Sequence, residues 1–239
     1  MKTITTSLSI VTLMFVSSCN GQTVKKQEIS YMDIFELSPE SAHPKAKELL
    51  TEDFYWSPIN ESGPFGSDDG SDAFYGFMQW RQSNARRSPV KYLDELLTEW
   101  GLPKFDIYEL DTNKINAYLI NNNKSDASLI AGLIPEIRKH YEEMGKREGK
   151  EFDEASFQKS IELSNQGMGQ RHLLGIDNAI IAVGFGQFVI EGKMDDDIKS
   201  LTKIALTREQ LPIMLEQWGE YKDVRKAMLA KMLADLDKM

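Results

Sequence analysis

The stretch "IDNAIIAVGFGQFVIEG", residues 176–192, decides the fold class of this chain. It is rich in β-branched residues, which favour strands, yet it is far longer than a typical strand of about 5–6 residues. Because the run contains no internal turn signal, its length predicts a buried helix. Gly184 and Gly186 either weaken that helix or mark places where a neighbouring helix comes close.

Helix-capping signals recur on both sides of this run. Ser88 and Pro89 read as an N-cap and a first helical residue, and Gly101 stands where a glycine often ends a helix. Asp153 can cap a later helix, and "TREQ", residues 207–210, is a capping-box pattern that predicts another helix start. The last segment carries a helical apolar stripe made of Val224, Met228, Met232, Leu233 and Leu236.

Residues 104–121 fit two structures, a β-hairpin or a helix. The surrounding pattern is helical throughout, and no internal repeat is present. The sequence therefore predicts a mainly α protein, with one domain over residues 31–239 that contains about 8–10 helices. A minor hairpin at 104–121 is the one β element compatible with the pattern.

The N-terminus has the layout of a secretory signal. Lys2 is followed by an apolar region over residues 8–16 and then by small residues, which predicts a cleaved segment over residues 1–18. "VSSC", residues 16–19, resembles the lipobox of bacterial lipoproteins, in which the cysteine is alkylated with diacylglycerol. Cys19 is the only cysteine, and lipidation explains a lone thiol in a secreted protein. An ordinary signal peptide with an incidental cysteine is the alternative.

These features predict that Cys19 anchors the protein by lipid to a membrane of the bacterial cell envelope. The polar stretch over residues 19–30 reads as a flexible tether. The formal net charge of −9 argues against a nucleic-acid partner, which requires clustered Lys and Arg. His43, His140 and His172 fit no zinc pattern, and the sequence contains neither a serine-nucleophile elbow nor a P-loop, so we assign no catalytic residue, metal or cofactor.

The stretch "GPFGSDDGSD", residues 63–72, is the strongest candidate for a binding face. We expect a tight polar loop and a helix that starts between Asp69 and Ala73, capped by Asp69 or Ser71. The spacing does not fit a calcium-binding EF-hand loop. Surplus carboxylates could form part of a binding face, and nearby aromatics either pack in the core or form a stacking platform. The tentative binding residues are Glu61, Asp68, Asp69, Asp72, Trp56 and Trp80.

Two segments carry a resemblance to a known family. "DFYWSPINESGPFGSDDGSDAFYGFMQWR", residues 53–81, and "LLGIDNAIIAVGFGQFVIEGKMDDDI", residues 173–198, resemble the uncharacterised bacterial YfeS-like proteins. The likeness covers much of the chain between Thr51 and Pro212. That family has no established activity, so the resemblance implies no catalytic residue.

The function expected from these features is a non-enzymatic envelope lipoprotein that binds another protein, for example in an immunity or inhibitor role. One alternative is a hydrolase of glycans or peptides that uses carboxylates of the 61–72 loop as acid and base. Another is a glycan-binding lipoprotein that uses exposed aromatic side chains.

Overall fold

The computed structural model describes residues 36–124, 127–164 and 166–239. Cys19, the signal segment and the tether lie outside these residues. Within them the chain forms helices and no strand, which confirms the mainly α fold. The elements are α1 (Pro44–Leu49), η2 (Asp53–Tyr55), α2 (Asp68–Ser83), α3 (Pro89–Glu99), α4 (Thr112–Asn121), α5 (Ala127–Arg147), α6 (Glu154–Ser164), α7 (Met168–Glu191), α8 (Asp196–Glu209), α9 (Pro212–Leu215), η3 (Glu216–Tyr221) and α10 (Lys222–Leu236).

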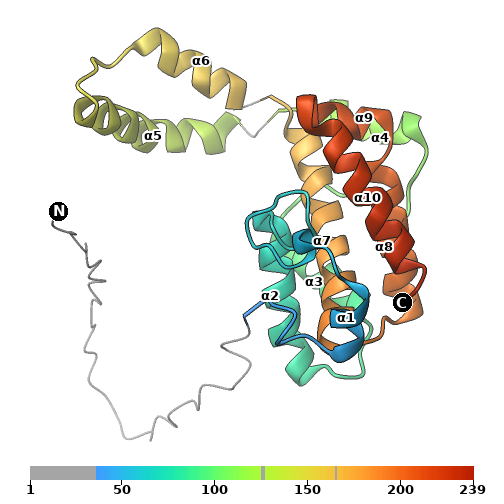
Figure 1. Ribbon diagram of the computed structural model, residues 1–239. Helices are drawn as coiled ribbons and strands as arrows, with labels where there is room; N and C mark the ends of the chain where they lie inside the picture. The colour runs from blue at the N-terminus through green and yellow to red at the C-terminus, as the bar shows by residue number, and fades with distance from the viewer. Residues whose placement is uncertain (1–35, 125–126, 165) are drawn as a thin grey trace, which may run out of the picture.

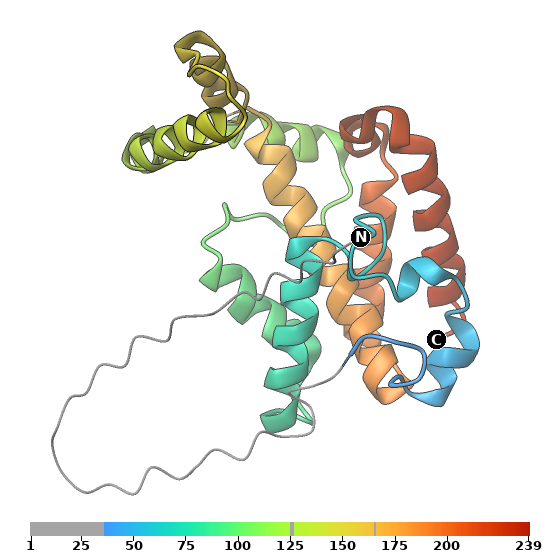
Figure 2. The same ribbon diagram turned by 60° about the vertical axis from the view of Figure 1, so that its left-hand side comes forward.

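Helix α7 is the core of the fold, as residues 176–192 predict. It runs through the middle of the body, with α2, α3 and α8 around it (Figures 1 and 2). Every residue from Ile176 to Val189 is buried. The helix is long and apolar enough to cross a bilayer, but 89% of its most apolar window is buried inside the protein, as in the core helix of a globular fold.

The glycines of α7 let neighbouring helices approach closely. A Cβ atom on Gly184 would lie 2.1 Å from Oγ1 of Thr202 on α8, and one on Gly186 would lie 2.7 Å from the Phe74 ring on α2. A Cβ on Gly169 would lie 2.2 Å from a backbone oxygen of α4, at Leu119. The glycines therefore mark helix contacts, which was one of the two readings of the sequence.

The contacts also give the helix directions. Helix α2 runs parallel to α7. Phe74 lies against Gly186, and Arg81, which comes later in α2, pairs with Glu191, which comes later in α7. Helix α8 runs antiparallel to α7, since Thr202 lies at Gly184 whereas Arg208 pairs with Asp177.

Helix α10 packs against α8 through its apolar stripe. Met232 and Leu236 of the stripe are fully buried, as is Leu229 next to it, whereas Met228 and Leu233 are half-buried. Val224, at the start of the stripe, is 50% exposed, so the buried contact begins one turn later than the pattern suggests.

Local signals are correct at both ends of α3 and wrong at the end of α8. The Ser88 side chain accepts the N–H of Val90 at the start of α3, and Gly101 has a φ of 64° just after its end. The "TREQ" pattern, by contrast, lies at the end of α8, where the Thr207 hydroxyl donates to the Lys203 carbonyl oxygen at 2.7 Å. The next helix begins at Pro212.

The hairpin reading of residues 104–121 is wrong, and the helix reading is correct for the second half of this segment. Its second half is the helix α4, capped by the Asp111 side chain, which accepts the N–H of Asn113 at 2.8 Å. The first half of residues 104–121 follows α3 in the chain. It has no helical structure, and it pairs with no strand among the described residues.

Helices α5 and α6 form an arm that projects from the body (Figures 1 and 2). The Asp153 cap is confirmed, because its side chain accepts the N–H of Ala155 at 3.0 Å. Within the arm, Arg138 pairs with Glu154 and lies over the Phe157 ring, 4.9 Å from its centroid.

Candidate functional site

The loop before α2 has the predicted tight form but a different cap. Helix α2 begins at Asp68, and the Ser67 hydroxyl oxygen accepts the N–H of Gly70 at 3.1 Å. The expected start between Asp69 and Ala73, with Asp69 or Ser71 as cap, is therefore wrong. The physical reason is that Phe65 is buried against Phe74, at 4.6 Å between ring centroids, which brings the chain into the helix earlier.

The four candidate carboxylates do not converge on one point. Glu61, Asp68 and Asp72 are exposed, and only Asp69 is half-buried. The carboxylate of Asp69 lies against α7, where a Cβ on Gly175 would be 3.0 Å from Oδ2. Burial raises the pKa of the Asp69 carboxyl, and the charges of Asp68 and Asp72 raise this pKa further.

The two candidate tryptophans are half-buried, and the side chain of each donates a hydrogen bond within the protein. Trp56 is half-buried against the core, and its Nε1 donates to the Leu50 carbonyl oxygen at 2.8 Å. Trp80 packs on Phe77, and its Nε1 donates to Glu95 on α3 at 2.9 Å. Because Trp80 follows Asp68 by twelve residues, about 18 Å of helix separates them. Trp80 therefore lies well away from Asp68 along α2.

We expect the Ser67 cap to contribute measurably to stability. Ser67→Ala should lower the free energy of unfolding by about 0.5–2 kcal/mol, because the N–H of Gly70 loses its acceptor. Ser71→Ala, inside the first turns of the same helix, is the matched control and should leave stability nearly unchanged. Urea denaturation of the two variants measures both. Equal losses would mean that Ser67 is not the cap.

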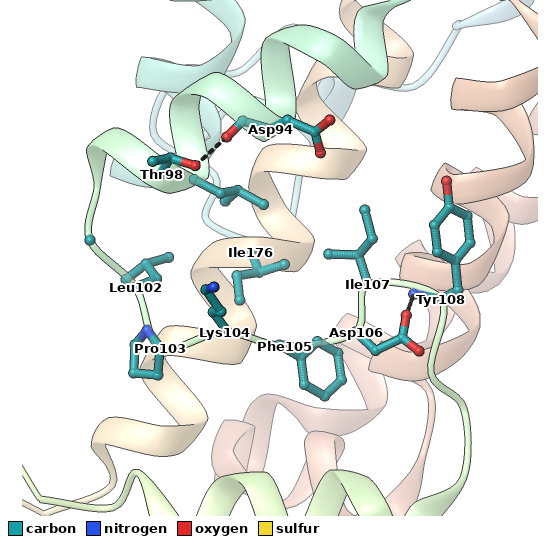
Figure 3. A pocket seen from close by; sticks show the side chains of 12 residues that line it. Asp94, Thr98, Leu102, Pro103, Lys104, Phe105, Asp106, Ile107, Tyr108 and Ile176 are labelled. Carbon is teal, nitrogen blue, oxygen red and sulfur yellow. Dashed lines mark hydrogen bonds between the residues drawn. The ribbon is translucent and has the colours of Figure 1, made fainter.

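A groove beside α3 is a second candidate site among the described residues. Its volume is about 590 Å³. We call it the α3 groove, and it is lined by Asp94, Leu97, Thr98, Gly101, Leu102, Pro103, Lys104, Phe105, Asp106, Ile107, Tyr108 and Ile176. Figure 3 shows Leu102 and Ile107 pointing into the space below α3, with Ile176 of α7 behind them.

One buried arginine fixes the wall of the α3 groove. Nη1 of Arg208 donates to the carbonyl oxygens of Ile107, at 3.0 Å, and Glu109, at 2.8 Å. Its guanidinium carbon lies 5.0 Å from the Phe105 ring centroid. Nε of the same guanidinium donates to both Asp177 carboxylate oxygens at 3.1 Å, and Nη2 donates to Oδ1. The 105–109 segment is thereby held onto α7 and α8.

A second buried ion pair lies beside the first. Nη2 of Arg225 donates to Glu209 at 3.0 Å, and Nη1 donates to the Ser62 carbonyl oxygen at 2.9 Å. The two pairs interact, because Glu209 raises the pKa of Asp177 whereas Arg225 lowers it. Burial is the largest influence and raises the pKa of Asp177, and Arg208 opposes this rise. The two arginines therefore hold both the 61–66 loop and the groove wall.

The sequence motifs considered above predict neither the α3 groove nor the two buried ion pairs. One feature of the sequence does indicate an ion pair: Asp177 is the only charged residue between Leu173 and Ile190. A carboxylate in a buried helix requires a cation and hydrogen bonds, so its position predicts a buried arginine or lysine. The sequence does not say which cation takes that role.

No protein-family model, no curated protein and no solved structure matches the chain. The resemblance to the YfeS-like proteins therefore stays a prediction, and the function has to be inferred from the geometry of the described residues.

Proposed function

We propose that this protein is a lipid-anchored protein of the bacterial cell envelope, without catalytic activity, that binds another protein through the α3 groove. The observation that carries the proposal is the groove itself. It combines an apolar floor with a few polar groups, the usual composition of a binding site, and Arg208 holds its wall in place.

The exposure of the lining favours a protein over a small ligand. Six of the lining residues are exposed: Asp94, Thr98, Gly101, Lys104, Asp106 and Tyr108. A small molecule in such an open groove would keep much of its surface in water, whereas small-ligand sites bury most of their ligand. A protein surface can cover the groove and its rim together. An immunity or inhibitor protein is one concrete form of this role.

The membrane anchor has its own test. Cys19→Ala should move the protein from the membrane fraction to the soluble fraction, because the acyl chains that hold it at the bilayer are lost. Thermal stability should not change, since Cys19 precedes the folded domain. Fractionation after a high-salt wash, followed by immunoblotting, measures the distribution. A variant that still sediments with membranes would contradict lipidation at Cys19.

The groove is tested by filling it. Thr98→Trp places a large side chain in the α3 groove, and Glu99→Trp places the same side chain beside it, on an exposed residue that does not line the groove. After crosslinking in intact cells, Thr98→Trp should reduce recovery of the partner by about tenfold or more, as expected for a blocked central contact.

Glu99→Trp should recover the partner at the level of the natural protein. Equal recovery with both variants would place the partner elsewhere on the surface. Failure to recover any stoichiometric partner with the natural protein would contradict the proposal as a whole.

The hydrolase alternative has one observation in its favour. The pKa of Asp69 is raised and the exposed Asp68 and Asp72 lie close enough to contribute to this rise. A carboxyl with a raised pKa, such as that of Asp69, can act as a general acid. If this alternative were right, the purified protein would cleave cell-wall glycan or unfolded casein, and Asp69→Asn would abolish the cleavage.

A further inference from the structure

The extended segment over residues 102–106, which forms one wall of the α3 groove, has an unusual number of free backbone groups. It belongs to no helix or turn. Within the described parts of the chain, the N–H groups of Leu102, Lys104, Phe105 and Asp106 donate no hydrogen bond. The carbonyl oxygens of Leu102, Lys104 and Phe105 accept none. Backbone groups in folded proteins are nearly always paired with protein or water, so this segment is available to a partner.

The segment is nevertheless fixed in position. The Tyr118 hydroxyl, on α4, donates to the Pro103 carbonyl oxygen at 3.0 Å. At the other end, the turn after Asp106 is held by Arg208 through the Ile107 carbonyl oxygen. A partner would therefore meet a preorganised edge, which lowers the entropy lost on binding.

The exposure alternates from Lys104 into the turn at residues 107–108. Lys104, Asp106 and Tyr108 are exposed, and Phe105 and Ile107 between them are half-buried, whereas Leu102 and Pro103 are both half-buried. This alternation has the period of extended backbone, and a hairpin is one of the two structures that the sequence fits here. The other half of that hairpin is the helix α4, so the strand-like segment has no partner within the described residues.

We propose that residues 102–106 bind an extended segment of the partner protein by backbone hydrogen bonding, as an added strand. Exposed strand edges bind peptides in this way, with affinity from the main chain and specificity from side-chain pockets. The proposal rests on the proposed protein-binding function and names the form of the ligand. An apolar side chain of the partner enters the hollow in front of Ile176.

The charges on the rim of the α3 groove indicate the composition of the partner's bound segment. Asp94, which pairs with Lys91 at 3.4 Å, and Asp106 lie on the rim with Lys104, and the whole chain carries a net charge of −9. Like charges across an interface are unfavourable, and complementary ones give specificity. The bound segment therefore carries a lysine or arginine next to its apolar anchor.

The test uses the full-length protein in detergent and linear decapeptides selected on it from a random phage-displayed library. The selected peptides should share an apolar residue next to Lys or Arg. Bound peptide should slow amide hydrogen exchange at Lys104 and Asp106 by about tenfold or more and much less at Phe105, because only the N–H groups of alternate residues face an added strand. N-methylation removes a backbone N–H of the peptide. At alternate peptide residues it should weaken binding by about tenfold, and at the residues between them by less than about threefold, because only alternate N–H groups bond across a strand pair.

Two variants of Lys104 distinguish the contribution of its backbone N–H to peptide binding from that of its side chain. Lys104→Pro removes one backbone N–H and should weaken peptide binding by about tenfold, whereas Lys104→Ala, which keeps that N–H, should stay within about threefold. If Lys104→Pro does not fold, the N-methylation scan on the natural protein decides.

Three results would overturn the strand inference: no selected peptide that protects Lys104 and Asp106, a bound peptide that becomes helical, or N-methylation effects without alternation. If Thr98→Trp still abolished capture of the partner in cells, the α3 groove would remain a protein-binding site with a different mode of contact. Failure of that capture experiment itself would instead count against the proposed function.

Discussion

Replacing Arg208 with methionine should lower the free energy of unfolding by about 3–5 kcal/mol. Arg208 and Asp177 have side chains that are 0% exposed, so the substitution leaves a carboxylate inside the protein without its cation. The carbonyl oxygens of Ile107 and Glu109 also lose their donor. Urea denaturation measures the loss directly.

The loss should depend on pH in a defined direction. Burial raises the pKa of Asp177 even with Arg208 present, and without Arg208 the pKa rises further. A carboxyl whose pKa is higher in the folded than in the unfolded state destabilises the protein increasingly as pH rises from its unfolded-state pKa to its folded-state pKa, and the destabilisation is complete above the folded-state pKa. Lowering the pH from 8 to 5 should therefore recover part of the stability of Arg208→Met.

The double variant Asp177→Leu with Arg208→Met is the control. Replacing both charges of a buried pair by apolar groups often costs little, in contrast to removing one. The double variant should be more stable than Arg208→Met alone and should lose the pH dependence. A double variant as unstable as the single one would show that the loss comes from the carbonyl contacts or from packing.

Gly184→Ala should destabilise the protein by about 1–3 kcal/mol, the range for overpacking in a well-filled core. The added Cβ would lie 2.1 Å from Oγ1 and 3.1 Å from Cβ of Thr202. Thr202 is buried and its hydroxyl donates to the Ile198 carbonyl oxygen at 2.8 Å, so this side chain has little freedom to move. Helices α7 and α8 would have to separate.

Gly132→Ala provides the matched control in α5, because a Cβ there meets no atom within 4 Å. Alanine has a higher helix propensity than glycine by about 1 kcal/mol, so this variant should be unchanged or slightly more stable. Thermal melts of both variants test the difference. A Gly184→Ala variant as stable as the natural protein would mean that the two helices do not touch at Gly184.

Much of the fold can be predicted from local patterns. The length of the apolar run at 176–192 identifies the core helix, and Ser88 and Gly101 mark the ends of α3. The "TREQ" pattern fails because Pro212 follows it. Proline favours the first turn of a helix and disfavours helical backbone in the residue before it, so the boundary falls at Leu211. The Thr207 hydroxyl then bonds back within α8.

The candidate site was much less predictable. The 61–72 carboxylates could be identified by composition, but Ser67 caps the helix and the half-buried Asp69 packs against Gly175. The α3 groove unites α3, the 101–108 segment and Ile176, which are distant in sequence and meet only through packing on α7. No local spacing encodes such a meeting. The isolated acid at Asp177 was the single sequence signal that pointed to this region.

The most direct test of protein binding at the α3 groove is site-specific photocrosslinking in living cells. A photoreactive amino acid replaces Tyr108, which lines the groove and is 52% exposed, or Tyr221 in η3, which is 62% exposed and lies outside the groove lining. The account predicts one discrete crosslinked protein from position 108, absent from position 221. No crosslinked product at 108, or the same product at both positions, would contradict it.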